Sequence, residues 1–148
     1  MTEHMMVPLD GSERAFKALE IAGDLAEKYG SRLILIHVIP ELKIPEGLDQ
    51  WVEIEHVNTP PSALYEQAVG DRLLDEAQQR LKGKKLAGIE SIVERGDPAN
   101  QILEAAKRMS ADSIVMATRG LSDIQGLVMG SVAHKVSHSA PCTVITVR

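Results

Sequence analysis

The sequence predicts an α/β fold in which a doubly wound, five-stranded parallel sheet is covered by helices on both faces, as in Rossmann-like domains. Short apolar runs alternate with amphipathic helical patterns along all 148 residues, and strands separated by helices run parallel and are joined by right-handed crossovers. Two of the runs, LILIHV and SIVMA, lack polar alternation, which is typical of strands buried on both faces. A chain of this length usually forms one domain, so we expect a single domain over residues 1–148.

The expected elements alternate strictly, beginning and ending with a strand. Strands are expected at Met5–Leu9, Leu33–Val38, Gly88–Glu94, Ser113–Ala117 and Cys142–Val147. Amphipathic spacing predicts helices at Glu13–Tyr29, Ser62–Leu81, Pro98–Met109 and Ser131–Ser139.

Local signals mark where these helices begin and end. Asp10 and Glu13 are spaced as a capping box for the first helix, and Gly30 is a stop signal after it. In the triplet GDP, Asp97 is the expected N-cap and Pro98 the first helical residue. The second helix is expected to bury one apolar stripe, formed by Val69, Leu73, Ala77 and Leu81.

Composition and charge exclude several classes of function. The net charge of −5 argues against a nucleic-acid partner, which requires a clustered excess of Lys and Arg. The longest apolar run is too short to span a bilayer, and no charged-then-apolar leader opens the sequence. Cys142 is the only cysteine, so no internal disulfide forms. We therefore expect a protein of the reducing cytoplasm that does not span a membrane.

The candidate site lies in the loops that follow three of the strands. In an open parallel sheet, ligands bind beyond the carboxyl ends of the strands, where the strand order reverses. The loop after Ser113–Ala117 reads ATRGLSDIQGLVMGS and ends at the start of a helix. Two interpretations stay open for this loop. Its glycines serve tight turns and Ser131 caps a helix, or backbone amides and the helix N-terminus bind phosphates.

Outside these loops, the sequence shows no pattern of residues that predicts a catalytic or metal site. His134 and His138 are four residues apart, but without a third ligand they do not predict a zinc site. His37 ends a buried strand and is expected to be a hydrogen-bonded core histidine, and Cys142 is expected to pack in the core. The Pro40–Pro61 segment, with four prolines, is expected to be a long loop that acts as a lid or a partner surface.

The final strand predicts self-association. Its sequence CTVITV carries no charge and no proline, so an exposed edge there would invite pairing with another chain. We expect a homodimer joined along Cys142–Val147, alone or within a higher oligomer.

Five motifs in order resemble the universal stress protein family. They are VPLDGSE, LILIHVIP, ERGDPANQILEAA, DSIVMATRG and GSVAHKVSHSAPCTVITVR, and the likeness covers the chain except Pro40–Leu81. The resemblance implies the strand order 3-2-1-4-5 and dimerisation through the final strand. One branch of the family binds ATP and carries the motif G-x2-G-x9-G-S/T, whereas another branch lacks both. This chain reads A-x2-G-x9-G-S, with Ala117 in place of the first glycine.

The resemblance also implies a set of nucleotide-binding residues. Pro8, Asp10 and Val38 are expected near the adenine or ribose, and the motif and its neighbours are expected at the ribose and phosphates: Ala117, Arg119, Gly120, Gly130, Ser131 and Val132. If the first glycine of the motif only provides room, the methyl group of Ala117 is tolerated. If that position needs a positive φ, alanine costs roughly 1 kcal/mol. Mg²⁺ or Mn²⁺ would accompany the phosphates.

Three hypotheses for the function stay open. The first is an ATP-binding regulatory protein of the stress response, a homodimer whose nucleotide state alters its assembly or its contact with a partner protein such as a transporter. The second is a slow ATPase that uses the same pocket, although no general base is legible and the chain is not expected to be an efficient enzyme. The third is a dimeric scaffold that binds no nucleotide.

Overall fold

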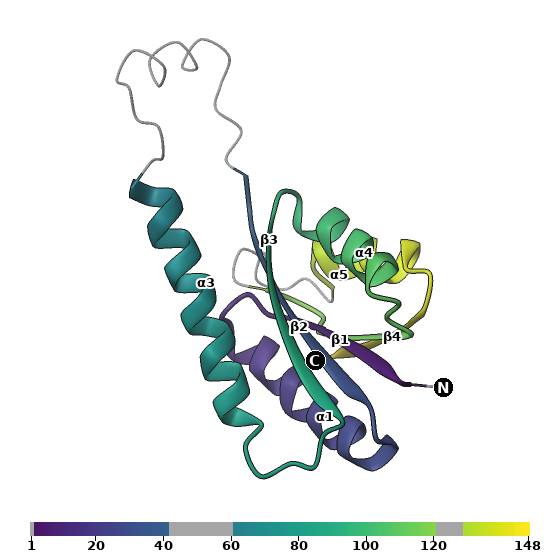
Figure 1. Cartoon of the computed structure of the whole chain (residues 1–148). Coiled ribbons are helices and arrows are strands. Elements are labelled where there is room, and N and C mark those ends of the chain that lie inside the picture. The colour runs from purple at the N-terminus through teal and green to yellow at the C-terminus, as the bar shows by residue number, and fades with distance from the viewer. Residues whose placement is uncertain (1, 42–60, 121–128) are drawn as a thin grey trace, which may run out of the picture.

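The computed structural model describes residues 2–41, 61–120 and 129–148, and it confirms the doubly wound α/β fold (Figure 1). The strands are β1 (His4–Pro8), β2 (Arg32–Ile39), β3 (Gly88–Arg95), β4 (Ser113–Ala117) and β5 (Thr143–Val147). The helices are α1 (Glu13–Tyr29), α3 (Pro61–Arg80), α4 (Pro98–Arg108) and α5 (Ser131–Ser139).

The described strands form one parallel sheet of order β3-β2-β1-β4-β5. The central strand β1 pairs with β2 on one side and with β4 on the other. The chain builds one half of the sheet outward to β3, then crosses back to β4 on the opposite side of β1. The strand order therefore reverses between β1 and β4, which defines the switch point at which such folds bind ligands.

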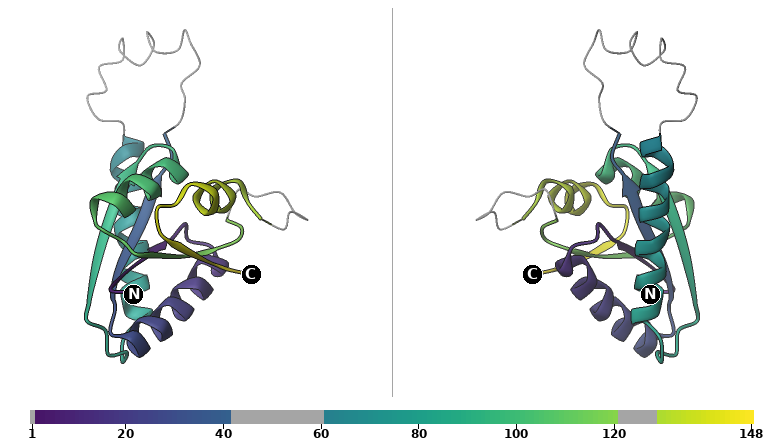
Figure 2. Two further views of the ribbon diagram at one scale, coloured as in Figure 1. Left: turned by 90° about the vertical axis from the view of Figure 1, so that its right-hand side faces the viewer. Right: turned by 90° about the vertical axis from the view of Figure 1, so that its left-hand side faces the viewer.

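Helices cover both faces of the sheet. Helices α1 and α3 lie on one side and α4 and α5 on the other, whereas β5 lies at a sheet edge near the C-terminus (Figures 1 and 2). Each face buries its own aliphatic core. Leu19, Leu33 and Leu35 belong to the core beneath α1 and α3, and Ile36 and Ile114 belong to the core beneath α4 and α5.

The start of α1 differs from the predicted capping box. Ser12, and not Asp10, is the N-cap, because its side chain accepts a hydrogen bond from the amide of Ala15. The change follows from Gly11, whose φ of 89° turns the chain between Asp10 and the helix. The predicted stop at the other end is confirmed, since Gly30 adopts the left-handed conformation with φ 70° and ψ 34°.

The buried stripe of α3 differs from the predicted one at two positions. Val69 is 45% exposed and Leu73 is half-buried, and the buried residues of the helix and its end are Gly70, Leu74, Ala77 and Leu81. A stripe that repeats strictly every four residues drifts away from the 3.6-residue period of the helix. The spacing of four, three and four residues in the observed stripe follows that period.

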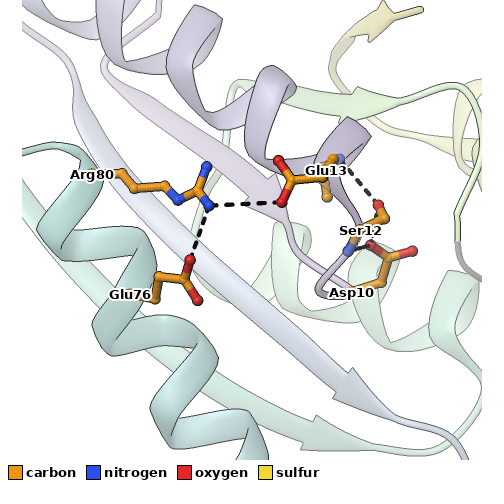
Figure 3. A network of polar contacts seen from close by, with 6 residues as sticks. Asp10, Ser12, Glu13, Glu76 and Arg80 are labelled. Carbon is orange, nitrogen blue, oxygen red and sulfur yellow. Dashed lines mark hydrogen bonds and ion pairs between the residues drawn. The ribbon is translucent and has the colours of Figure 1, made fainter.

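Arg80 joins α3 to α1 across one face of the sheet. Its guanidinium carbon lies 3.9 Å from the centroid of the Phe16 ring, and its Nη2 lies 2.9 Å from Glu76 and 3.9 Å from Glu13 (Figure 3). The Glu13 side chain is 88% exposed, so that ion pair adds little in water. The contact with the buried Phe16 ring is therefore the main contribution of Arg80 to stability.

The substitution Arg80→Ala is expected to lower the free energy of unfolding by about 1 kcal/mol, because it removes the cation–π contact and the cover over Phe16. Urea unfolding monitored by circular dichroism measures this change. Arg72→Ala is the matched control, since Arg72 is an exposed arginine on the same helix. Equal losses in the two variants would contradict the role of the Phe16 contact.

Two predicted features lie wholly or mainly outside the described residues. The Pro40–Pro61 loop is described only at its ends, and the interior of the loop after β4 is not described.

Among the residues that are described, no helix is both long enough and apolar enough to cross a membrane.

Candidate functional site

A cavity of about 370 Å³ opens at the carboxyl ends of β1, β2 and β4, at the switch point of the sheet. It brings together most of the predicted binding residues, namely Pro8, Asp10, Val38, Ala117, Arg119, Gly120 and Val132. Gly130 and Ser131 are not among the lining residues, although their neighbours Val132 and Ala133 are. The volume lies in the range typical of small-molecule sites.

Among the residues that the structure describes, the wall of the cavity is largely apolar and carries one formal charge of each sign, from Asp10 and Arg119. Aliphatic side chains from both halves of the sheet supply most of the lining, including Ile36, Val38 and Met116. A flat apolar group fits such a wall, while a polar extension can reach the charged side chains at its rim. This combination is typical of pockets for small organic ligands.

The N-terminus of α5 lies beside the cavity and is suited to an anion. Its N-cap is Gly130, which has no side chain to accept a hydrogen bond from the first turn. The other two described N-caps, Ser12 and Asp97, both accept a first-turn amide with their side chains. The first-turn amides of α5, from Ser131 onward, have no intrahelical carbonyl partner, so they and the helix dipole favour negative charge.

Backbone hydrogen bonds fix the two ends of the loop that carries the glycine motif. The amide of Gly130 donates to the carbonyl of Thr118 at 2.6 Å, and the amide of Thr118 donates to Val147 at 2.9 Å. The start of α5 is thereby held against the end of β4. The residue spacing of the motif thus places Gly120 in the cavity wall and Gly130 at the adjacent helix start.

Ala117 imposes no backbone strain on the site. It is the last residue of β4, and Ser110 is the single non-glycine residue with a positive φ among those described. The position therefore does not require glycine for conformational reasons. The methyl group of Ala117 can affect ligand binding only through the space that it occupies, because Ala117 is 9% exposed and lines the cavity.

Asp10 shapes the turn between β1 and α1. Its Oδ1 accepts hydrogen bonds from the amide of Ser12 at 2.9 Å and from the Ser12 hydroxyl at 2.6 Å (Figure 3). The carboxylate thus orients the residue that caps α1, and at the same time Asp10 lines the cavity. The predicted structural role of Asp10 is retained, but it acts through the turn rather than as the cap itself.

His37 was predicted to be a hydrogen-bonded core histidine, and the hydrogen bond is confirmed. Its Nδ1 lies 2.7 Å from the carbonyl oxygen of Leu9, and the side chain is half-buried. A carbonyl can only accept, so Nδ1 carries the proton. The residue also belongs to the cavity wall, which the sequence interpretation did not anticipate.

The other titratable candidates lie outside the cavity wall. The rings of His134 and His138 stack with centroids 6.4 Å apart, and both side chains are exposed. Burial raises the pKa of the half-buried Cys142 thiol, and the charge of Asp112 raises it further, so this cysteine is no activated nucleophile. Within the described residues, no three His, Cys, Asp or Glu side chains are placed to hold a metal ion.

Sequence reasoning missed the residues of α4 that line the cavity. Pro98 and Ile102 line the cavity from the first turns of this helix. The available signal was topological, because a helix that follows β3 returns along the sheet and begins at its carboxyl edge. Thr118 and Pro40 were missed as well, although each directly follows a strand of the structure.

The fold and the cavity define a doubly wound α/β protein with a cavity of small-molecule size at its switch point. The model of the universal stress protein family matches residues 1–148, and the chain therefore belongs to this family. It is 31% identical over 153 residues to the universal stress protein YxiE of Bacillus subtilis, with all of both chains covered. It also resembles the solved structure of universal stress protein UspA from Lactobacillus plantarum, with a TM-score of 0.84, 23% identity, and 99% and 98% of the two chains covered.

Three further solved structures of universal stress proteins share this fold and contain nucleotides. One is in complex with cAMP (TM-score 0.75, 23% identity), and one from Archaeoglobus fulgidus is in complex with dAMP (0.69, 20%). The third, from Arabidopsis thaliana, has AMP bound (0.65, 18%). The alignments cover 97–100% of this chain and 90–98% of theirs.

Proposed function

We propose that this protein is an ATP-binding regulatory member of the universal stress protein family. Its nucleotide state alters its assembly or its contact with a partner protein. The observation that carries the proposal is the cavity at the switch point, which gathers Asp10, Val38 and Arg119 from the carboxyl ends of three separate strands. The adenine nucleotides bound to three structural neighbours support the choice of ligand.

The two halves of the site suit the two halves of a nucleotide. In the proposed complex, the apolar wall around Pro8 and Val38 receives the adenine, and Asp10 lies near the ribose. The phosphates extend past Arg119 and Gly120 toward the N-terminus of α5, where the N-cap Gly130 leaves room for a close approach and Ser131 and Val132 present backbone amides. Mg²⁺ or Mn²⁺ enters with the phosphates, which supply most of its ligands.

The proposed assembly is a homodimer in the cytoplasm, joined along β5. This strand is at the edge of the described sheet, with β4 as its one described neighbour. Apolar and threonine side chains without charge make TVITV a suitable partner for a second copy. A transporter is one candidate class for the regulated partner protein.

Nucleotide content and calorimetry test the proposal directly. The purified protein is denatured and the supernatant analysed for released nucleotide by chromatography, and the emptied protein is then titrated with ATP and ADP. Release of an adenine nucleotide or a saturable heat supports an ATP-binding protein. Absence of both leaves the nucleotide-free dimeric scaffold, whereas phosphate released above a buffer blank during incubation with ATP supports the slow ATPase instead.

Restoring the family motif is expected to change little. The substitution Ala117→Gly should leave the dissociation constant for ATP within about threefold of wild type, because Ala117 has no positive φ to relieve. The variant is expected to unfold at a slightly lower temperature, since glycine loses more conformational freedom on folding than alanine does. Isothermal titration calorimetry checks the affinity, and a gain above about tenfold would show that the methyl group obstructs the ligand.

A further inference from the structure

We propose that His37 is a positioning residue of the nucleotide site, acting from the side of α3 through the backbone of Leu9. This inference rests on the proposed function and assigns to that site a residue outside the family's glycine motif. The ring donates from Nδ1 to the Leu9 carbonyl at 2.7 Å. Leu9 directly follows β1 and directly precedes Asp10 in the cavity wall.

Leu9 is held to β2 from both of its backbone groups. Its amide donates to the carbonyl of Ile36 at 2.8 Å, which extends the β1–β2 ladder by one residue. Its carbonyl accepts from the His37 ring. The second bond comes from a side chain and not from the ladder, so it depends on the identity of one residue. With both groups fixed, the peptide plane between Leu9 and Asp10 has one orientation.

The orientation of that peptide decides where Asp10 lies. The carboxylate of Asp10 accepts two hydrogen bonds from Ser12, and Gly11 between them has a φ of 89°. A turn built on a left-handed glycine is easily reoriented unless its flanks are fixed. Ser12 and α1 fix the far flank, and His37 fixes the near one. The hydrogen bond of His37 therefore sets the position of a group proposed to contact the ribose.

Gly70 of α3 provides the space that the ring occupies. A β-carbon added at Gly70 would lie 3.0 Å from Cδ2 of His37, which is closer than almost all real contacts, and 3.6 Å from both methyl groups of Val93. The ring is thus confined between α3 and the end of β1. Glycine in a helix interior is unfavourable relative to alanine, and close packing against His37 explains its presence there.

The first test compares variants that remove or retain the donor. His37→Leu removes it and is expected to raise the dissociation constant for ATP at least about tenfold, because the Leu9 carbonyl loses its partner. His37→Asn places an amide N–H where Nδ1 was, so affinity should return to within about threefold of wild type. His4→Leu is the matched control, since His4 lies at the opposite end of the sheet with its ring near the carbonyl of Ser110.

The second test is a double-mutant cycle with Gly70. Gly70→Ala is expected to weaken ATP binding about threefold when His37 is present, because the new methyl group displaces the ring. With His37→Ala, which has no atom beyond Cβ, the same substitution should cause no further change in affinity, since the ring atom that it meets is gone. Thermal unfolding of every variant separates binding from stability. Equal effects of Gly70→Ala on both backgrounds overturn the role of the packed ring.

The outcomes separate this inference from the proposed function. Wild-type ATP binding that persists within about twofold in His37→Leu overturns the positioning role and leaves the proposed function intact. If the wild-type protein binds no ATP, the proposed function fails, and ¹⁵N spectra of the imidazole in the free protein decide the geometry. A proton on Nδ1 supports the contact with Leu9, whereas a ring protonated at Nε2 alone overturns it.

Discussion

The substitution Val38→Phe is expected to weaken ATP binding at least about a hundredfold, with little change in stability. Val38 lines the cavity and packs against the core beneath α4 and α5. It is half-buried and one residue from the end of β2, so a larger ring there projects into the open space rather than into the closed core. Phenylalanine is also well tolerated in strands, which protects the fold.

Calorimetric titration with ATP measures the effect of Val38→Phe, and thermal unfolding reports the stability of the variant. Val69→Phe is the matched control, because Val69 is exposed on α3 and does not line the cavity. Wild-type affinity in Val38→Phe at an unchanged unfolding temperature would mean that the nucleotide binds elsewhere.

The substitution Thr146→Pro is expected to convert the proposed dimer into a monomer. Val147 accepts a hydrogen bond from Thr118, so its backbone groups face β4. Backbone groups alternate between the two sides of a strand, and those of Thr146 therefore face away from β4, toward the open edge. Proline removes that outward donor and leaves the β4–β5 ladder intact. A second copy that pairs along this edge would lose the hydrogen bond from Thr146 and meet the proline ring.

Size-exclusion chromatography with light scattering reads the result for Thr146→Pro, with wild-type protein expected at twice the chain mass. Thr146→Val keeps the backbone N–H and the β-branched shape, and it should remain a dimer. A wild-type protein that elutes as a monomer, or a dimer that survives Thr146→Pro, contradicts association through β5.

Patterns that depend on local chemistry predicted the fold closely. Helix α1 has the predicted bounds because Gly30 adopts the left-handed stop conformation, and α4 begins as predicted because Asp97 caps it with Pro98 in the first turn. The errors occurred where tertiary geometry decides. The turn at Gly11 moved the cap from Asp10 to Ser12.

The site was predicted in part for a similar reason. The glycine spacing and the ends of the strands indicated where Asp10, Val38 and Gly120 lie, and the cavity contains all three. A single stretch of sequence does not reveal which distant elements close over a site, so Ile102 of α4 was missed. The contact between His37 and Leu9 joins residues 28 apart in the chain, and no spacing rule predicts it.

The cavity also has a consequence for folding. Its walls come from the ends of β1, β2 and β4 and from the first turns of α4 and α5, so they span the chain from Pro8 to Ala133. No fragment that lacks one half of the sheet can form the site, and a partly folded chain has no cavity in which the ligand can bind. Any ligand that binds there therefore binds only the completely folded chain. It raises the free energy of global unfolding by an amount that grows with the logarithm of the ratio of the ligand concentration to the dissociation constant.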